Sequence, residues 1–269
     1  MCGSSWVARL VKRRRFIVQV LTAGSALVWG GAAHLSSASS PSTIRISGEG
    51  VIIEAYRALP VGRPWAAVLL VPEEAGLNAF IAGVAAELAT LGFAVLVPDL
   101  YSRLGGTAAL GPNPAAALEK LNDSLIARDL DLSFAYLEKL LGPQGKIAIL
   151  GFGWGGSKAL TYATENPDIA AVAVFYAPNP EPVGRVLNLE MPLLGNYAAL
   201  DEAVTPKLAE LEAALTKAGK TYDFKIYPGV RAGFFGAALA GPPGAAASRD
   251  AWERTVQFFR RTLAAQEQP

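Results

Sequence analysis

The residue types that most often carry nucleophilic and metal chemistry are nearly absent from this sequence. Its only cysteine is Cys2 and its only histidine is His34, so neither type occurs from position 35 onward. A Ser-His-Asp triad, a Cys-His pair, a histidine-rich metal site and an intramolecular disulfide are therefore excluded from that part of the chain. We expect no metal and no cofactor there, which leaves carboxylates, hydroxyls, amines and backbone amides for any chemistry.

One glycine-rich segment has the pattern of a turn that positions a reacting group. Residues 147–156, IAILGFGWGG, predict an apolar strand, a sharp glycine turn and the start of a helix. In α/β-hydrolases such a turn, the nucleophile elbow, holds the nucleophile above the sheet at a helix N-terminus. The central position here is Gly153, which has no side chain to attack a substrate.

Five ordered blocks make the chain resemble the dienelactone hydrolase family, whose elbow reads G-x-C-x-G-G and whose triad is Cys, Asp and His. The blocks are residues 73–80 (EEAGLNAF), 97–103 (VPDLYSR), 147–156, 192–206 (PLLGNYAALDEAVTP) and 227–234 (YPGVRAGF). The resemblance extends over residues 47–263. It implies an α/β-hydrolase fold, in which a mostly parallel sheet carries helices on both faces.

The resemblance maps the triad onto Gly153, Asp201 and Ala232, so both the nucleophile and the base are replaced. It also gives Glu73 the place of the glutamate that contacts the family's resting nucleophile. Neither glycine nor alanine attacks a carbonyl or relays a proton, so we expect the acyl-enzyme route to be lost. A site built from backbone amides would still bind and orient a ligand, with a modest effect on rate.

Other side chains near the mapped site are candidates for ligand binding: Glu73, Tyr101, Trp154, Asp201 and Arg231. Glu73 and Asp201 could form a carboxylate pair that activates water. The alternative, which we favour, is that each is hydrogen-bonded in place or paired with Arg231. Trp154 could give a ligand a stacking surface, but filling the vacated site or packing elsewhere is the stronger expectation for a large aromatic side chain.

Ser157 and Lys158 form a further candidate nucleophile pair, because serine with lysine is a known arrangement. They are adjacent on the helix predicted after the elbow. Neighbouring side chains on a helix point about 100° apart. We therefore do not expect these two side chains to converge.

The elements that must position these residues alternate along the chain. Apolar strands are expected at residues 66–71, 94–98, 146–151, 170–176, 191–196 and 223–227. Helices are expected at residues 78–91, 126–141, 155–166, 206–218 and 249–263. Apolar strands separated by helices indicate a mostly parallel sheet covered on both faces, with residues 43–48 and 51–58 as an antiparallel hairpin at its edge. Residues 236–248 are expected to be a loop within one domain, residues 44–269.

The N-terminal 35 residues predict export or anchoring. Basic residues at 9 and 12–15 precede an apolar stretch at 16–33, and the sequence KRRRFI resembles a twin-arginine signal. As an apolar helix of about 27 Å, residues 16–33 would nearly span a bilayer. A cleaved signal and a single-pass anchor both remain open, and either places the folded domain on the non-cytoplasmic side, in the periplasm or a lumen. Residues 36–43 are a predicted linker.

Charge narrows the classes of function. From position 35 onward the chain has 19 basic and 23 acidic residues with no basic run, which argues against nucleic-acid binding. The leading hypothesis is an inactive dienelactone-hydrolase-like protein that serves as a binding or structural accessory subunit of a membrane complex. The alternatives are a weak hydrolase of small esters or lactones that uses Glu73, Asp201 and water, and a carrier of a small-molecule ligand.

Overall fold

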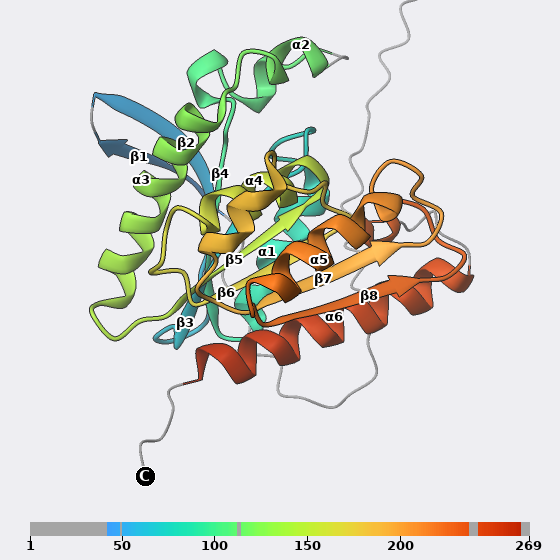
Figure 1. Cartoon of the computed structure of the whole chain (residues 1–269). Helices are drawn as coiled ribbons and strands as arrows, with labels where there is room; N and C mark the ends of the chain where they lie inside the picture. Colours follow the sequence, from blue (N-terminus) through green and yellow to red (C-terminus); the bar gives the residue numbers. More distant parts are fainter. Residues whose placement is uncertain (1–41, 49, 112–113, 237–241, 265–269) are drawn as a thin grey trace, which may run out of the picture. The chain divides into compact units, whose positions relative to one another are not determined.

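One eight-stranded sheet forms the centre of the molecule in the computed structural model, which describes residues 42–48, 50–111, 114–236 and 242–264 (Figure 1). Its strand order is β1-β2-β4-β3-β5-β6-β7-β8. The strands are β1 (Ser42–Gly48), β2 (Val51–Ala58), β3 (Ala66–Val71), β4 (Phe93–Pro98), β5 (Ile147–Phe152), β6 (Ala171–Phe175), β7 (Leu193–Ala198) and β8 (Tyr222–Tyr227). Only the β1·β2 and β2·β4 pairs are antiparallel, so the predicted edge hairpin and parallel sheet are both confirmed.

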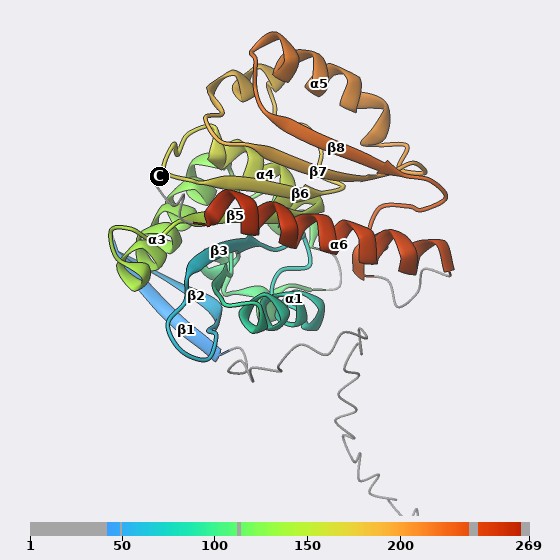
Figure 2. The ribbon, with the colours of Figure 1, turned by 90° about the horizontal axis from the view of Figure 1, so that it is seen from below.

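Helices cover the two faces of the sheet. They are α1 (Ala79–Thr90), α2 (Ala115–Leu118), α3 (Asp123–Leu141), α4 (Gly153–Ala163), α5 (Leu208–Lys217) and α6 (Pro242–Leu263). Helices α1 and α6 lie on one face and α3, α4 and α5 on the other (Figure 2). This is the three-layer arrangement expected when parallel strands must be buried on both sides.

The strands alternate between the two cores, as their period of two residues requires. In β3, Val68 and Leu70 belong to the core beneath α1 and α6, whereas Leu69 and Val71 belong to the core beneath α3, α4 and α5. All six residues of β3 are buried. The central strands are therefore apolar throughout and their carboxyl ends meet at one edge of the sheet.

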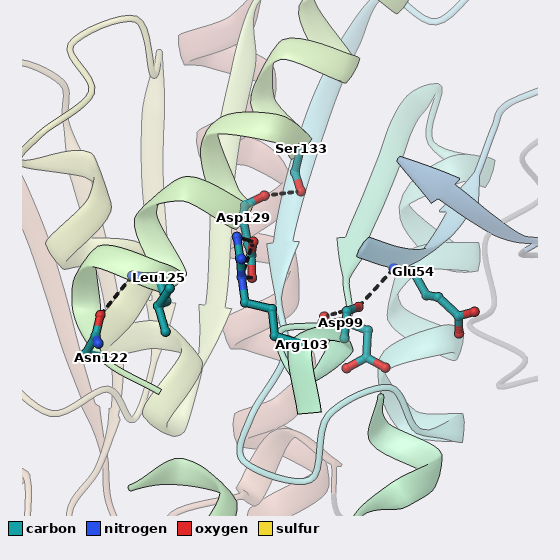
Figure 3. A network of polar contacts seen from close by, with 8 residues as sticks. Glu54, Asp99, Arg103, Asn122, Leu125, Asp129 and Ser133 are labelled. Atoms are coloured by element: carbon teal, nitrogen blue, oxygen red, sulfur yellow. Dashed lines mark hydrogen bonds and ion pairs between the residues drawn. The ribbon is translucent and has the colours of Figure 1, made fainter. Parts of the chain in front are cut away.

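Two asparagine side chains fix where helices begin. The Asn78 carboxamide oxygen accepts from the Ile81 N–H at 2.9 Å, and the Asn122 oxygen accepts from the Leu125 N–H at 3.0 Å. Each cap satisfies one of the N–H groups that a helix start leaves without a partner. Figure 3 shows the second cap, at the start of α3.

Helix α6 differs from the prediction, because it begins at Pro242 and the expected loop therefore ends there. Proline is accepted in a first helical turn, where its missing N–H costs no helical hydrogen bond. Strand β1 likewise begins at Ser42, inside the predicted linker. The predicted apolar helix at residues 16–33 lies outside the described residues, and no described helix is long and apolar enough to cross a membrane.

Candidate functional site

The turn between β5 and α4 is packed so tightly that three of its glycines admit no side chain. A Cβ on Gly155 would lie 2.0 Å from the Pro72 carbonyl oxygen, and one on Gly151 would lie 2.6 Å from the Gly156 Cα. A Cβ on Gly156 would lie 2.7 Å from the Ala177 Cβ. Helix α4 therefore presses directly on the ends of β3, β5 and β6, which holds its N-terminus at the carboxyl edge of the sheet.

Gly153 is different, because it has the left-handed backbone of the elbow and room for a Cβ. Its φ is +50°, in the region that L-residues rarely adopt. A Cβ there would meet only the Glu74 Oε2 at 3.7 Å and the Tyr176 ring at 3.9 Å, which are ordinary contact distances. The elbow conformation is thus present at a position that carries no nucleophile.

Tyr176 forms one wall of this space and is itself strained. It follows β6 with φ +40°, the sole described non-glycine residue with positive φ, and its side chain is 4% exposed. Its hydroxyl is buried without a hydrogen-bond partner among the described residues. Burial and the negative charges of Glu73 and Glu74 raise the pKa of Tyr176 well above its usual value, so it stays a neutral donor.

Two consecutive glutamates follow β3 and supply the carboxylates of the site. Glu74 is exposed and its Oε2 is the atom nearest to the Cβ position of Gly153. Glu73 is half-buried, and burial, with the charge of Glu74 beside it, raises the pKa of Glu73. The structure thus places Glu74, one residue beyond the glutamate that the sequence pattern indicated, against the elbow.

Aromatic packing brings the segment after β8, which includes Ala232, to the elbow. The Phe235 ring stacks on Phe152 with centroids 5.5 Å apart, and Phe234 meets Tyr176 edge-on at 5.7 Å. Phe152 immediately precedes Gly153, while Phe234 and Phe235 come soon after Ala232. The segment that contains Ala232 is therefore anchored next to the turn that contains Gly153.

The segment that contains Asp201 joins the same edge through backbone hydrogen bonds. The Leu200 N–H donates to the Val230 carbonyl at 2.9 Å, which pairs the two loops. The buried Asp201 carboxylate accepts from the backbone N–H groups of Ala203 and Val204, both at 3.1 Å. Its Oδ1 is therefore engaged in holding its own turn.

Comparison with known proteins agrees with this geometry. The model of the dienelactone hydrolase family matches residues 53–263. A Methylorubrum extorquens protein named "Putative carboxymethylenebutenolidase" is 31% identical over 93% of this chain and 93% of its own length. The "Carboxymethylenebutenolidase" of Rhodococcus opacus is 29% identical over 73% of this chain and 81% of its own.

The chain belongs to the dienelactone hydrolase family. A crystal structure named "Putative Dienelactone Hydrolase", from Klebsiella pneumoniae, matches with a TM-score of 0.75 and 26% identity, covering 82% of this chain and 98% of the other. The sequence resemblance predicts the nucleophile position at Gly153 and the histidine position at Ala232. In the structure, Gly153 lies in the turn between β5 and α4, and the segment that contains Ala232 is anchored beside that turn by Phe234 and Phe235.

Tyr101 is buried next to the glutamates and is held by a network of polar contacts. Its hydroxyl donates to the Glu74 carbonyl oxygen at 2.7 Å, so it fixes the backbone of the glutamate turn. Burial, followed by the charges of Glu74 and Asp99, raises the pKa of Tyr101 to about 12. Tyr101 therefore holds the backbone of the glutamate turn through its hydroxyl. This role differs from the predicted contact with a ligand.

The segment that follows Tyr101 is held by further polar contacts, made by Ser102 and Arg103 (Figure 3). The Ser102 hydroxyl donates to the Asp99 carbonyl at 2.6 Å and accepts from the Glu54 N–H at 2.9 Å. The Arg103 guanidinium forms an ion pair with Asp129 at 2.7 Å, and both of its contacting nitrogens reach that carboxylate. These contacts join the loop to β2 and α3.

The candidate Ser157–Lys158 pair does not form, as expected. The Lys158 ammonium makes an ion pair with Asp123 at 2.7 Å and lies 5.8 Å from the Trp154 ring centroid. The Ser157 hydroxyl faces the Asn179 carbonyl at 3.5 Å. The two side chains thus have separate partners, as their angular separation on α4 predicts.

Trp154 packs against the core, in line with the stronger expectation for it, whereas Arg231 does not form the ion pair that was one expectation. Trp154 packs against the core beneath α3, α4 and α5, whereas Phe152 and Tyr176 belong to the core on the other face. Arg231 is exposed, and it makes no ion pair with Glu73 or Asp201 among the described residues. The alternative in which Arg231 neutralises a carboxylate of the site is therefore wrong.

The sequence interpretation missed Glu74 and Tyr176. Both follow the carboxyl ends of parallel strands, β3 and β6, which flank the elbow strand β5. Strand ends at that edge are where ligand contacts concentrate in parallel sheets. That rule, applied to every strand end, would have found both residues.

Among the described residues, no three side chains that could hold a metal come together.

Proposed function

We propose that this chain is a dienelactone hydrolase family member that has lost nucleophilic hydrolysis and serves as a binding subunit. The observation that carries the proposal is Gly153, where the elbow backbone persists with φ +50° and no side chain. Acyl transfer by this fold needs an attacking atom at that position and a base beside it. Ala232 cannot supply the base.

The residues at the elbow support binding of a small ligand. The first N–H groups of α4 have no helical partner and favour a negatively charged or carbonyl oxygen. The Tyr176 hydroxyl is a buried donor without a partner among the described residues, and the ring that carries it lies 3.9 Å from the Cβ position of Gly153. These donors suit a ligand oxygen.

The test is restoration of the missing chemistry. We expect the unaltered chain to hydrolyse p-nitrophenyl acetate no faster than buffer alone does. The double variant, Gly153→Cys with Ala232→His, should hydrolyse it. A thiol activated by an imidazole should exceed either single variant by roughly a hundredfold, because general base catalysis contributes about that much. Equal rates for the unaltered chain and the double variant would overturn the proposal.

One observation favours a second candidate, weak hydrolysis by activated water. The pKa of Glu73 is raised by burial, which makes its carboxylate a better base than an ordinary glutamate. If this function holds, the unaltered chain hydrolyses small esters and Glu73→Gln abolishes the rate. Asp201→Asn should have a smaller effect, since its Oδ1 is engaged by two backbone N–H groups.

We also propose that the protein is held at a membrane, with its folded domain on the non-cytoplasmic side, as an accessory subunit of a membrane complex. Support comes from the basic and then apolar order of residues 9–33. Extraction of native membranes in mild detergent, followed by native electrophoresis and peptide mass spectrometry, tests this. A band of a large complex that still contains residues 16–33 is expected, and a cleaved chain migrating alone would contradict it.

A further inference from the structure

The edge of the sheet opposite the elbow carries an exposed apolar loop beside a hollow. In the loop between β2 and β3, the Val61 side chain is 63% exposed and Trp65 is 41% exposed. The hollow measures about 320 Å³ and is lined by Arg63, Pro64, Trp65, Leu141, Gln144 and Gly145. This surface, formed by residues 60–65 and the end of α3, is called the basal surface below.

The exposed tryptophan is held in place by the fold. Its ring packs on Phe93 with centroids 4.6 Å apart, and its Nε1–H donates to the Leu91 carbonyl at 3.3 Å. Gly92 lies beneath it, and a Cβ there would come within 2.7 Å of the Trp65 ring. These contacts hold the Trp65 ring in one orientation, in which part of its apolar surface faces solvent.

Two basic side chains lie in the segments that form the basal surface, Arg63 in the loop and Lys139 in the last turn of α3. Arg63 and Lys139 are exposed and make no ion pair with another described residue, and Glu138 is an acidic neighbour in the last turn of α3. The Lys146 ammonium donates to the Ala264 carbonyl at 3.1 Å, which brings the end of α6 beside Gly145.

The end of α6 adds two more cations, Arg260 and Arg261, both exposed in its last turn. Cations there also stabilise the helix through its dipole, so they serve α6 whatever else they contact. The chain from position 35 onward is net acidic, with 19 basic and 23 acidic residues, so basic side chains at this edge contrast with its overall charge. A net acidic domain thus presents basic and aromatic side chains together at one edge.

The N-terminal segment leaves the domain next to this surface. Strand β1 begins at Ser42, which pairs with Arg57 near the end of β2, just before the exposed loop. Forty-one residues precede Ser42, and the last eight of them, 34–41, reach at most about 27 Å when extended. A membrane segment at residues 16–33 would therefore be joined to Ser42 by a short connection.

We propose that the basal surface lies against the anionic phospholipid headgroups of the membrane that holds residues 16–33. This inference rests on the membrane attachment proposed above. Tryptophan favours the interface between water and lipid, and arginine pairs with phosphate oxygens. The orientation directs the carboxyl edge of the sheet, with Gly153 and Glu74, away from the lipid and leaves the elbow open to solution.

The experiment uses the full chain with Cys2→Ser, reconstituted in vesicles of phosphatidylcholine with phosphatidylglycerol. A polarity-sensitive fluorophore is attached after Val61→Cys or, as a matched control, after Ile52→Cys. Ile52 is 60% exposed, like Val61, but lies at the other end of β2. We expect lipid-borne quencher to reach the label at position 61 and not the label at position 52.

Charge and lipid composition sharpen the test. Arg63→Glu should lower the ratio of docked to free domain at least about fivefold, because each basic residue near an anionic surface contributes about that factor. With the Arg63 chain, replacing the vesicles by ones of phosphatidylcholine alone should lower the ratio of docked to free domain by a similar factor. Flotation of the vesicles in sodium carbonate reports separately whether residues 16–33 hold the chain.

The outcomes separate the two proposals. A chain that floats with the vesicles while both labels stay equally exposed to water overturns the docking inference and leaves the attachment intact. A chain that does not float overturns both. Protection of position 61 in native membranes but not in lipid vesicles identifies a protein as the occupant and also overturns the lipid inference.

Discussion

The room for a side chain differs among the glycines of the elbow: Gly151, Gly155 and Gly156 have none, whereas Gly153 has room for a Cβ. At Gly151, Gly155 and Gly156 a single added carbon would meet backbone or a neighbouring side chain at 2.0–2.7 Å. At Gly153 the same carbon meets nothing closer than 3.7 Å. The turn is therefore fixed by the packing of α4 on the sheet, which does not depend on a nucleophile. The same turn thus combines three crowded glycines with one position that has room for a side-chain carbon.

The largest expected effect is that of Gly155→Ala. Its Cβ would lie 2.0 Å from the Pro72 carbonyl oxygen, so α4 must move from the sheet. Overpacking of this kind costs roughly 3 kcal/mol of unfolding free energy. Urea unfolding of the full chain measures it, with Gly83→Ala on the open side of α1 as the control that should be neutral or stabilising. An equal cost at both sites would refute the comparison.

Gly153→Ala should cost less, about 1 kcal/mol, because only the left-handed backbone opposes it. Gly50 is a matched control, since its φ is +77° and a Cβ there meets nothing within 4 Å. The two alanine variants should lose similar amounts of unfolding free energy in urea. If Gly153→Ala were as costly as Gly155→Ala, the space at the elbow would be closed.

Tyr176→Phe removes the buried hydroxyl that has no partner among the described residues. A buried donor without a partner costs on the order of 1 kcal/mol, so the variant should gain about that much stability. Thermal unfolding compares it with Tyr227→Phe, which removes a hydroxyl bonded to Asp250 at 2.6 Å and should lose stability. A loss in both variants would mean that Tyr176 has a partner such as an ordered water.

The smallest effect is expected from the pH dependence that Glu73 contributes. Its folded pKa lies above the ordinary glutamate value, so the folded chain holds this proton more tightly than the unfolded chain. Stability from this group is present below about pH 4.5 and is lost as the pH rises through the folded pKa. Unfolding free energies from pH 4 to 8 should show a shallower fall in Glu73→Gln than in the unaltered chain. An unchanged slope would contradict the raised pKa.

Much of the fold could be predicted from local pattern, because buried parallel strands are continuous apolar runs. Strand β3 has the predicted bounds, residues 66–71; β4 begins one residue earlier than predicted, and β5 is shifted by one residue at both ends. The predicted start of α6 was wrong, since the proline- and alanine-rich residues 242–248 have no apolar period of their own. Tertiary contact supports them: Ala247 is buried, and the Ser248 hydroxyl donates to the Phe234 carbonyl at 2.7 Å.

For the site, too, some features could be predicted from the sequence and others depend on tertiary contacts. The assignment of the nucleophile and base positions to Gly153 and Ala232 rests on residue identity within the family pattern, and it stays a prediction. Which glutamate faces the elbow depends on how the turn after β3 is held. There the Tyr101 hydroxyl bonds the Glu74 carbonyl and the Thr107 hydroxyl accepts from the Leu77 N–H. Those contacts come from distant segments and have no signature beside Glu74.

The sequence by itself determined the family, the order of strands and helices, and the absence of cysteine and histidine from position 35 onward, because these depend on residue type and local period. Only the tertiary structure decided that the elbow keeps its strained geometry and that Glu74 and Tyr176 border the open position. It also decided that Asp201 is engaged by its own turn. The physical reason is that those facts are set by close contacts between segments far apart in the chain, where a few tenths of an ångström separate open space from a clash.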